Sequence, residues 1–169
     1  MSNPRPLGFD AIAEARRQWE AHGWSAPAAM AATTSIMRAH QIILARTEEA
    51  LRPFDLTFAR YEALVLLAFS RQGALPMGKM GDRLMLHPTS VTNIIDRLER
   101  QGLVQRAAHP TDRRTTLAEI TDDGRRVVDK ATEAVSATGF GMAAISDDDL
   151  DHITSLLRTI RVDAGDFPG

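Results

Sequence analysis

The sequence predicts a mainly α-helical protein. Apolar residues recur at the three- and four-residue spacing of helices along most of the 169 residues, and strand-like alternation appears only between Leu103 and Ile120. Hydrophobic residues make up 44% of the chain and charged residues 25%, as in ordinary folded domains, which excludes disordered and collagen-like chains. A chain of this length forms one domain with a sizeable core, or such a core with one appendage.

Composition excludes several other classes. No window holds the roughly 18 consecutive apolar residues of a membrane span, and residues 1–9 lack the apolar core of a secretion signal, so we expect a cytoplasmic protein without membrane contact. The chain has no cysteine, which excludes disulfides, zinc ribbons, iron–sulfur clusters and thiol-based oxidant sensing by its own residues. Its net charge of −2 argues only weakly against nucleic-acid binding, because a local basic patch can still bind phosphate.

Residues 1–55 are predicted to form two helices. Asp10 is a suitable N-cap for a short helix that Gly23 ends, and we assign residues 1–25 to an N-terminal extension. No glycine or proline interrupts the pattern after Pro27 until Pro53, so residues 26–55 should hold the longest helix.

Apolar residues recur every seven positions along this long helix, in two adjacent rows. The rows are Met30, Met37, Leu44 and Leu51, and Ala29, Ile36, Ile43 and Ala50. This spacing suits helix-on-helix packing, either in the chain's own core or between two chains. The combined width of the rows indicates contact with more than one neighbour and favours a dimerisation helix.

Residues 56–121 combine short helices with a hairpin. Leu56 and Thr57 fit a staple and cap for a helix that ends at Gly73. A helix over residues 77–84 and another from Pro88 to Gly102, joined by a tight turn, have the outline of a helix-turn-helix. Residues 103–106 and 115–120 are expected to be strands around a turn-rich segment. The predicted fold is therefore a winged helix-turn-helix with a two-stranded wing.

Residues 122–169 are predicted to form C-terminal dimerisation helices and a tail. Thr121 caps one helix, and Ser146 with Asp149 has the spacing of a capping box for the last helix. That helix carries a single apolar stripe, composed of Leu150, Ile153, Leu157 and Ile160. Together with the long helix of residues 26–55, it would flank the winged lobe. We expect the tail from residue 163 onward to fray.

Charge is distributed unevenly along the chain. Five arginines against two acids give residues 97–114 a net charge of +3, whereas two arginines against six aspartates give residues 146–169 a net charge of −4. Positive charge thus gathers at the predicted wing, as DNA binding requires, because phosphate contacts supply most of the sequence-independent affinity.

The helix opened by Pro88 divides into two faces. Its apolar face holds Val91, Ile94, Ile95 and Leu98, and its polar face holds Thr89, Ser90, Thr92, Asn93 and Arg97. Short hydroxyls and an amide near a helix N-terminus suit phosphate oxygens and base edges in a major groove. An ordinary surface helix has a similar polar face, but the arginines Arg113 and Arg114 in the adjacent hairpin favour DNA binding.

Several motifs resemble the MarR family of bacterial transcriptional regulators. They are Leu56-Thr57, Val91-Thr92, the run from Arg97 to Val104, Asp112-Arg113-Arg114, and the run from Ile120 to Gly124. The resemblance covers residues 30–162. It implies a homodimer with interleaved first and last long helices, which places two winged lobes on successive major grooves of a pseudo-palindromic DNA site.

The resemblance also assigns roles to individual residues. The five polar residues Thr89, Ser90, Thr92, Asn93 and Arg97 would face the major groove. Arg114 would enter the adjacent minor groove, and Arg113 would contact phosphate. Asp112 would hold the wing arginine or an arginine of the recognition lobe in place, because a carboxylate facing phosphates is repelled.

An extra N-terminal helix with a tryptophan resembles the urate-responsive branch of this family. Trp19 and Glu62 match two residues of that branch's ligand site, but Ile94 stands where its arginine would align, so urate would lack its cationic partner here. Members commonly bind small aromatic or phenolic anions between the dimerisation helices and the winged lobe, and His40 and Tyr61 would also border such a pocket. Residues such as His40, Tyr61 and Glu62 are more often structural than ligand contacts, and for Trp19 the favoured interpretation is that it packs the extra helix onto the dimer.

The sequence therefore predicts a homodimeric, sequence-specific DNA-binding regulator, acting as a repressor that a small aromatic or phenolic anion releases. A winged-helix module that binds another protein without specific DNA binding is the alternative. We expect no enzyme, because the five histidines are scattered and no metal pair, nucleophile elbow or phosphate loop is present. Accordingly, we predict no catalytic residue, metal or cofactor.

Overall fold

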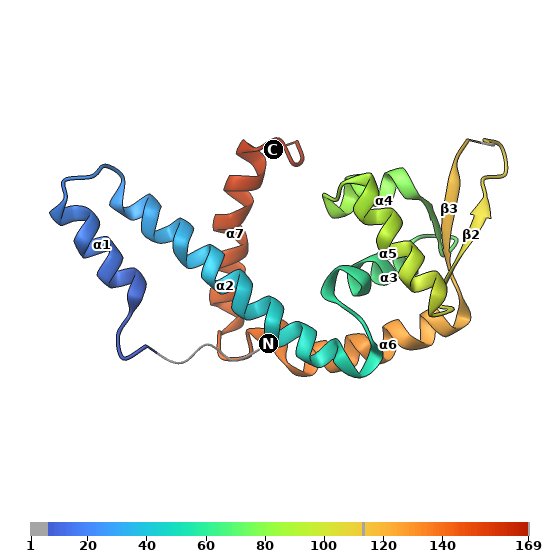
Figure 1. Cartoon of the computed structure of the whole chain (residues 1–169), viewed down its shortest axis with the longest axis horizontal. Helices are drawn as coiled ribbons and strands as arrows, with labels where there is room; N and C mark the ends of the chain where they lie inside the picture. The colour runs from blue at the N-terminus through green and yellow to red at the C-terminus, as the bar shows by residue number, and fades with distance from the viewer. Residues whose placement is uncertain (1–6, 113, 169) are drawn as a thin grey trace. The chain divides into compact units, whose positions relative to one another are not determined.

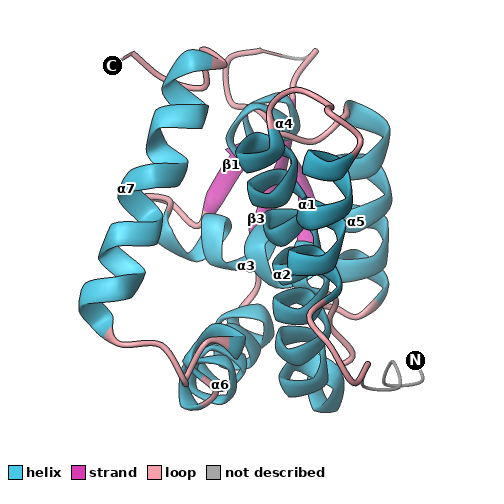
Figure 2. Cartoon of the chain, turned by 90° about the vertical axis from the view of Figure 1, so that its left-hand side faces the viewer, coloured by secondary structure: helices cyan, strands magenta, loops and turns pink. Residues whose placement is uncertain are grey.

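The computed structural model describes residues 7–112 and 114–168, and helices make up most of them (Figure 2). The chain forms two compact units, Met1–Ala45 and Arg46–Gly169, and each is described by itself. Among the described residues, no helix is both long enough and apolar enough to cross a membrane.

The first unit contains α1 (Ala11–Ala21) and most of α2 (Pro27–Leu51). Asp10 caps α1 as predicted, since its Oδ1 accepts hydrogen bonds from the backbone nitrogens of Ile12 and Ala13. Near the C-terminal end of α1, the Trp19 ring packs edge-to-face against Trp24, with 4.8 Å between the ring centroids. The Trp19 indole nitrogen donates to the Ser25 carbonyl at 2.8 Å, so this tryptophan stabilises the turn that leads into α2.

The second unit contains the end of α2, a winged lobe and the C-terminal helices (Figure 1). Its elements are η1 (Arg52–Phe54), α3 (Phe58–Phe69), β1 (Ala74–Pro76), α4 (Met77–Leu84), α5 (Pro88–Arg100), β2 (Val104–Ala108), β3 (Thr116–Ile120), α6 (Asp122–Ala137), η2 (Gly139–Gly141) and α7 (Asp147–Asp163). The core is formed by buried apolar residues of α3, α4, α5, the sheet and α6. Leu64, Leu67, Met80, Ile95, Leu98, Val104 and Val135 are its largest fully buried side chains apart from Leu51 of α2.

The sheet is antiparallel and has the strand order β1–β3–β2. In the β2–β3 hairpin, Val104 pairs with Ile120 and Ala108 with Thr116, which confirms the predicted two-stranded wing. The third strand, β1, was not predicted, and Leu75 within it pairs with Ala118 of β3. A strand of three residues is too short to show alternation in a sequence, and pairing with β3 defines it instead.

The end of α3 and the C-terminal tail differ from the sequence prediction. The helix expected to run to Gly73 ends at Phe69, because Ser70 adopts an extended conformation and the chain turns at Gly73 into β1. The tail after α7 was expected to fray, but Phe167 packs against two arginines of that helix. The guanidinium carbons of Arg158 and Arg161 lie 5.0 and 5.3 Å from the centre of the Phe167 ring.

The helix caps predicted from the sequence are confirmed. Thr57 caps α3, and Thr121 caps α6 while its hydroxyl also donates to the Gly102 carbonyl at 2.8 Å. Gly124 in the first turn of α6 is required by packing, because a Cβ there would lie 2.2 Å from the Leu103 carbonyl oxygen. The Ser146 hydroxyl accepts from the backbone nitrogen of Asp149 and thus begins α7. The contacts of Thr121 with Gly102 and of Gly124 with Leu103 join α6 closely to the end of α5 and the start of the wing.

Candidate DNA-binding surface

The helix-turn-helix consists of α4 and α5, joined by a tight turn. Met85 in this turn has a φ of +52°, which is unusual for a residue with a side chain. His87 caps α5, since its Nδ1 accepts from the backbone nitrogen of Thr89 at 3.3 Å, and Pro88 occupies the first helical position. Buried Val91, together with the other buried residues of α5, fixes the orientation of the helix against the core.

The polar face of α5 faces solvent in the second unit. Thr89, Thr92, Asn93 and Arg97 are exposed, and Ser90 is half-buried. The Thr92 hydroxyl donates to the Pro88 carbonyl at 3.0 Å and keeps its lone pairs available as acceptors. Ile94, which stands where the urate-responsive branch has an arginine, is half-buried against the core.

The wing turn is organised by Asp112. Its Oδ1 accepts from the backbone nitrogen of Arg114 at 3.0 Å, and its Oδ2 accepts from the Thr115 hydroxyl at 2.6 Å. The hydrogen bonds from Thr115 and Arg114 lower the pKa of the Asp112 carboxyl, and the bond from Thr115 has the larger effect. Asp112 therefore holds the wing arginine through its backbone, and the Arg114 side chain remains exposed. Arg113, which was expected to contact phosphate, lies outside the described residues.

A groove of about 640 Å³ runs between the starts of α4 and α5 and the wing. Lys79 of α4 and Arg114 of the wing supply its cationic side chains, and Asp82 contributes a carboxylate. Its hydroxyls come from Thr92, Thr115 and Thr116. Two residues predicted separately, Thr92 of α5 and Arg114 of the wing, thus line one groove whose cations and hydroxyls suit phosphate or base-edge oxygens.

Arg106 forms a contact that the sequence analysis missed. Its Nη2 donates to Oδ1 of Asp96 at 2.5 Å, its Nη1 pairs with Glu99, and its backbone nitrogen donates to Glu99 Oε1 at 3.3 Å. Hydrogen bonding to Asp96 is the main cause that raises the pKa of the Arg106 guanidinium. The net charge predicted for residues 97–114 included Arg106, but the structure pairs this arginine with two acids. Two acids three residues apart on a helix were the available sequence signal.

The four residues predicted to border a ligand pocket occupy different environments. Tyr61 is buried, and its hydroxyl lies 3.0 Å from that of Thr132, so it joins α3 to α6. Glu62 is exposed, and partial desolvation raises the pKa of its carboxyl. Trp19 and the exposed His40 belong to the first unit, whereas Tyr61 and Glu62 belong to the second.

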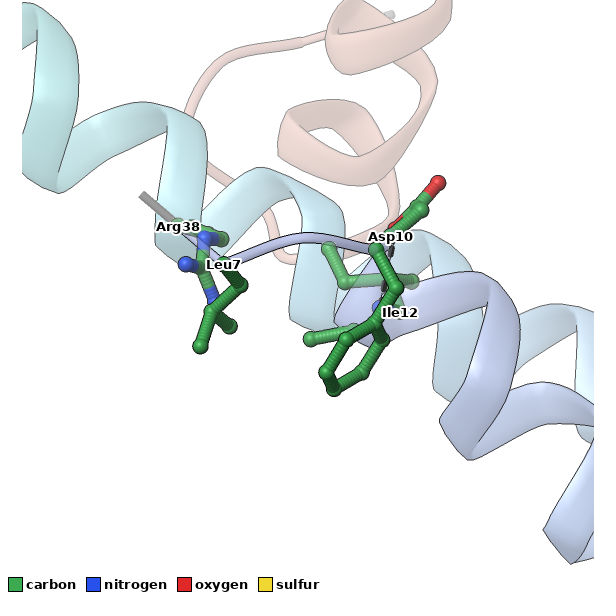
Figure 3. Close-up of a pocket in the computed structure, with 6 residues that line it drawn as sticks. Leu7, Asp10, Ile12 and Arg38 are labelled. Carbon is green, nitrogen blue, oxygen red and sulfur yellow. Dashed lines mark hydrogen bonds between the residues drawn. The ribbon is translucent and has the colours of Figure 1, made fainter. Parts of the chain in front are cut away.

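The first unit contains a smaller hollow of about 210 Å³ near the start of α1 (Figure 3). Its lining consists of Leu7, Phe9, Asp10, Ala11, Ile12 and Arg38, and therefore includes neither Trp19 nor His40. Over residues 7–112 and 114–168, no group of three or more metal-ligating side chains is arranged to hold a metal ion.

The known proteins that this chain resembles are transcriptional regulators. A model of the MarR family matches residues 56–116. The crystal structure of a MarR family transcriptional regulator from Streptomyces coelicolor is 54% identical and superposes with a TM-score of 0.78, covering 83% of this chain and 98% of that one. The organic hydroperoxide resistance transcriptional regulator of Bacillus subtilis is 33% identical over 65% of this chain and 73% of its own length.

A third similar protein has been solved with a ligand. CouR from Rhodococcus jostii, bound to p-coumaroyl-CoA, is 29% identical and has a TM-score of 0.67, covering 79% of this chain and 90% of its own.

Proposed function

This chain belongs to the MarR family of transcriptional regulators, and we propose on that basis that it is a sequence-specific DNA-binding repressor. The observation that carries the proposal is the groove shared by Thr92 of α5 and Arg114 of the wing. A helix and a wing that contribute to one surface can contact a major groove and the neighbouring minor groove together. The exposed residues Thr89, Asn93 and Arg97 extend this surface along α5.

We propose that the functional form is a homodimer. Leu156 and Ile160 on α7 are 59% and 58% exposed, and no described residue of α7 is buried in the single chain. In the first unit, α2 exposes Ile36, Met37 and Ile42. Apolar helix faces of this extent are stabilised by a second copy of the chain, and a two-fold dimer binds a pseudo-palindromic operator.

Repression is the simpler regulatory outcome for this surface. Occupying a promoter blocks transcription by steric exclusion and needs no contact beyond those with DNA. Binding to chromosomal DNA would place the protein in the cytoplasm.

We further propose that a small aromatic or phenolic anion releases the protein from DNA. The p-coumaroyl-CoA bound to the Rhodococcus protein joins a phenolic ring to an anionic carrier, which supports this chemical class. The Bacillus relative is named for organic hydroperoxide resistance, but this chain has no cysteine and so has no thiol for peroxide to oxidise. A non-covalent ligand is therefore the appropriate effector to test.

Footprinting on the DNA immediately upstream of the protein's own gene tests these proposals. We expect protection of two half-sites about one helical turn apart, lost on addition of p-coumarate or a related aromatic acid. Protection that an unrelated duplex competes away equally well would instead favour a winged-helix module that binds another protein. Protection that persists with every aromatic acid would contradict the proposed effector class alone.

A further inference from the structure

Arg106 joins the wing to the C-terminal half of α5. Its side chain is 31% exposed, and those of Asp96 and Glu99 are 43% and 39% exposed, so all three are partly shielded from water. Asp96 and Glu99 lie three residues apart and therefore on the same side of α5. One guanidinium bridges both acids, and the Arg106 backbone nitrogen adds a third contact. We call these three residues the Arg106 clamp.

The clamp lies where it can restrict movement of the β2–β3 hairpin relative to α5. Strand β2 is an edge of the sheet, and beyond Val104 it buries no side chain fully. The hairpin is held at its base by buried Val104 and Ile120, and on the β3 side also by buried Ala118 and by pairing with β1, so the β2 edge beyond Val104 is the less anchored side. The hairpin extends beside α5 toward the turn that carries Arg114 (Figure 1). The clamp lies between the base and the turn, where it can limit rotation of the hairpin relative to α5.

The proposed DNA-binding surface depends on the orientation of the wing relative to α5. Thr92 and Arg114 line the groove together, although they belong to different elements. A rotation of the wing would move Arg114 away from the DNA groove that it is proposed to enter, while α5 stayed in place. Base contacts carry sequence specificity and need precise geometry, so specific binding should be the quantity that a misplaced wing reduces.

We propose that Arg106 is a positioning residue, which fixes the wing relative to α5 so that both contact one DNA site, and which does not itself bind phosphate. This inference rests on the proposed DNA-binding function. The clamp also keeps the charges of Asp96 and Glu99 neutralised beside the DNA-binding helix, where free carboxylates would repel phosphate.

Three variants test the proposal. Arg106→Met removes the clamp, and Arg106→Lys keeps the positive charge but cannot bridge two carboxylates with a rigid fork. Arg126→Met is the matched control, because Arg126 forms an exposed ion pair with Asp123 within α6 and so does not connect the hairpin to α5. Circular dichroism melting of each variant shows whether the chain stays folded.

The first measurement is binding to the upstream duplex and to an unrelated duplex over a salt series. We expect both Arg106 variants to lose about tenfold in their preference for the upstream duplex over the unrelated one, with the slope of log K against log salt unchanged. In Arg106→Met, the unpaired carboxylates of Asp96 and Glu99 should also weaken binding to both duplexes equally. Full affinity in Arg106→Lys, with a slope lower by about one in Arg106→Met, would show that Arg106 contacts phosphate and would overturn the proposal. An unchanged preference for the upstream duplex in both variants would overturn it as well.

The second measurement needs no DNA. Hydrogen exchange of the β2 and β3 amides in the free protein should be faster in Arg106→Met than in wild type or Arg126→Met. Equal exchange in all three proteins would overturn the positioning role. Absence of specific binding by the wild type would refute the proposed function, whereas the exchange experiment would still report on the clamp.

Discussion

The carboxylate of Asp112 accepts a hydrogen bond from the backbone nitrogen of Arg114, at 3.0 Å. Together with the bond from the Thr115 hydroxyl, it fixes the conformation of the wing turn while leaving the Arg114 side chain exposed. This role explains why an acid lies at the proposed DNA-binding surface: Asp112 orders the turn that carries Arg114.

This arrangement predicts a specific pH dependence. The pKa of Asp112 is lowered in the folded protein, so the order that its ionised form provides is complete above the pKa of a free aspartate. That order is lost only as the pH falls through the lower, folded value. Chemical shifts of the Arg114 and Thr115 amides should report a midpoint below that of a free aspartate, and a midpoint at or above it would contradict the hydrogen bonds.

Removing Arg114 should weaken DNA binding. We expect Arg114→Ala to cost about 1–3 kcal/mol of binding free energy if the side chain enters a groove, and to lower the salt slope by about one if it also neutralises a phosphate. Arg126→Ala, which removes an arginine from α6, is the control. Fluorescence anisotropy across a salt series measures both quantities, and an Arg114→Ala curve superimposable on wild type would remove the wing from the interface.

Substitution of Glu62 should stabilise the protein at neutral pH. Desolvation raises the pKa of Glu62 in the folded state, so ionisation costs folding free energy as the pH rises from the unfolded pKa through the folded one. Glu62→Gln should therefore unfold at a slightly higher temperature at pH 7. The gain in free energy of unfolding should stay below about 1 kcal/mol, because water screens the exposed carboxylate. The gain should disappear below the unfolded pKa; a gain of equal size at low pH would show another cause.

The apolar stripe of α7 provides a test of assembly. Ile160 is exposed in the single chain, so Ile160→Glu should leave its fold intact but place an unpaired charge in a dimer interface, at a cost of several kcal/mol. We expect light scattering to show a folded monomer. Ser155→Glu, on the opposite side of α7, should remain dimeric. A dimer of unchanged stability in Ile160→Glu would place the interface elsewhere.

Local chemistry explains which parts of the fold could be predicted from sequence. Caps such as Thr57, Thr121 and Ser146 depend on neighbours within three residues, so their signals lie in the sequence itself. The two faces of α5 follow from helical periodicity, and the structure buries Val91, Ile95 and Leu98 while exposing Thr89, Thr92, Asn93 and Arg97.

Features that depend on residues far apart in the sequence were not predicted. Strand β1 has three residues and exists because it pairs with β3, more than forty positions later in the chain. The Arg106 clamp pairs charges on a helix and a strand, and a count of charges could not show which arginines were already paired. Tyr61 was expected to border a pocket because amphipathic residues suit both cores and ligand sites, and the structure buries it in the core and places its hydroxyl beside that of Thr132.

The most direct test of DNA binding by α5 and the wing is the ratio of affinities for the protein's own upstream duplex and a scrambled duplex of equal composition. We expect wild type to prefer the upstream duplex by about a thousandfold or more at physiological salt, and Asn93→Ala to lose preference without a change in salt slope. Equal affinity for both duplexes, falling steeply with salt, would contradict sequence-specific recognition by this surface.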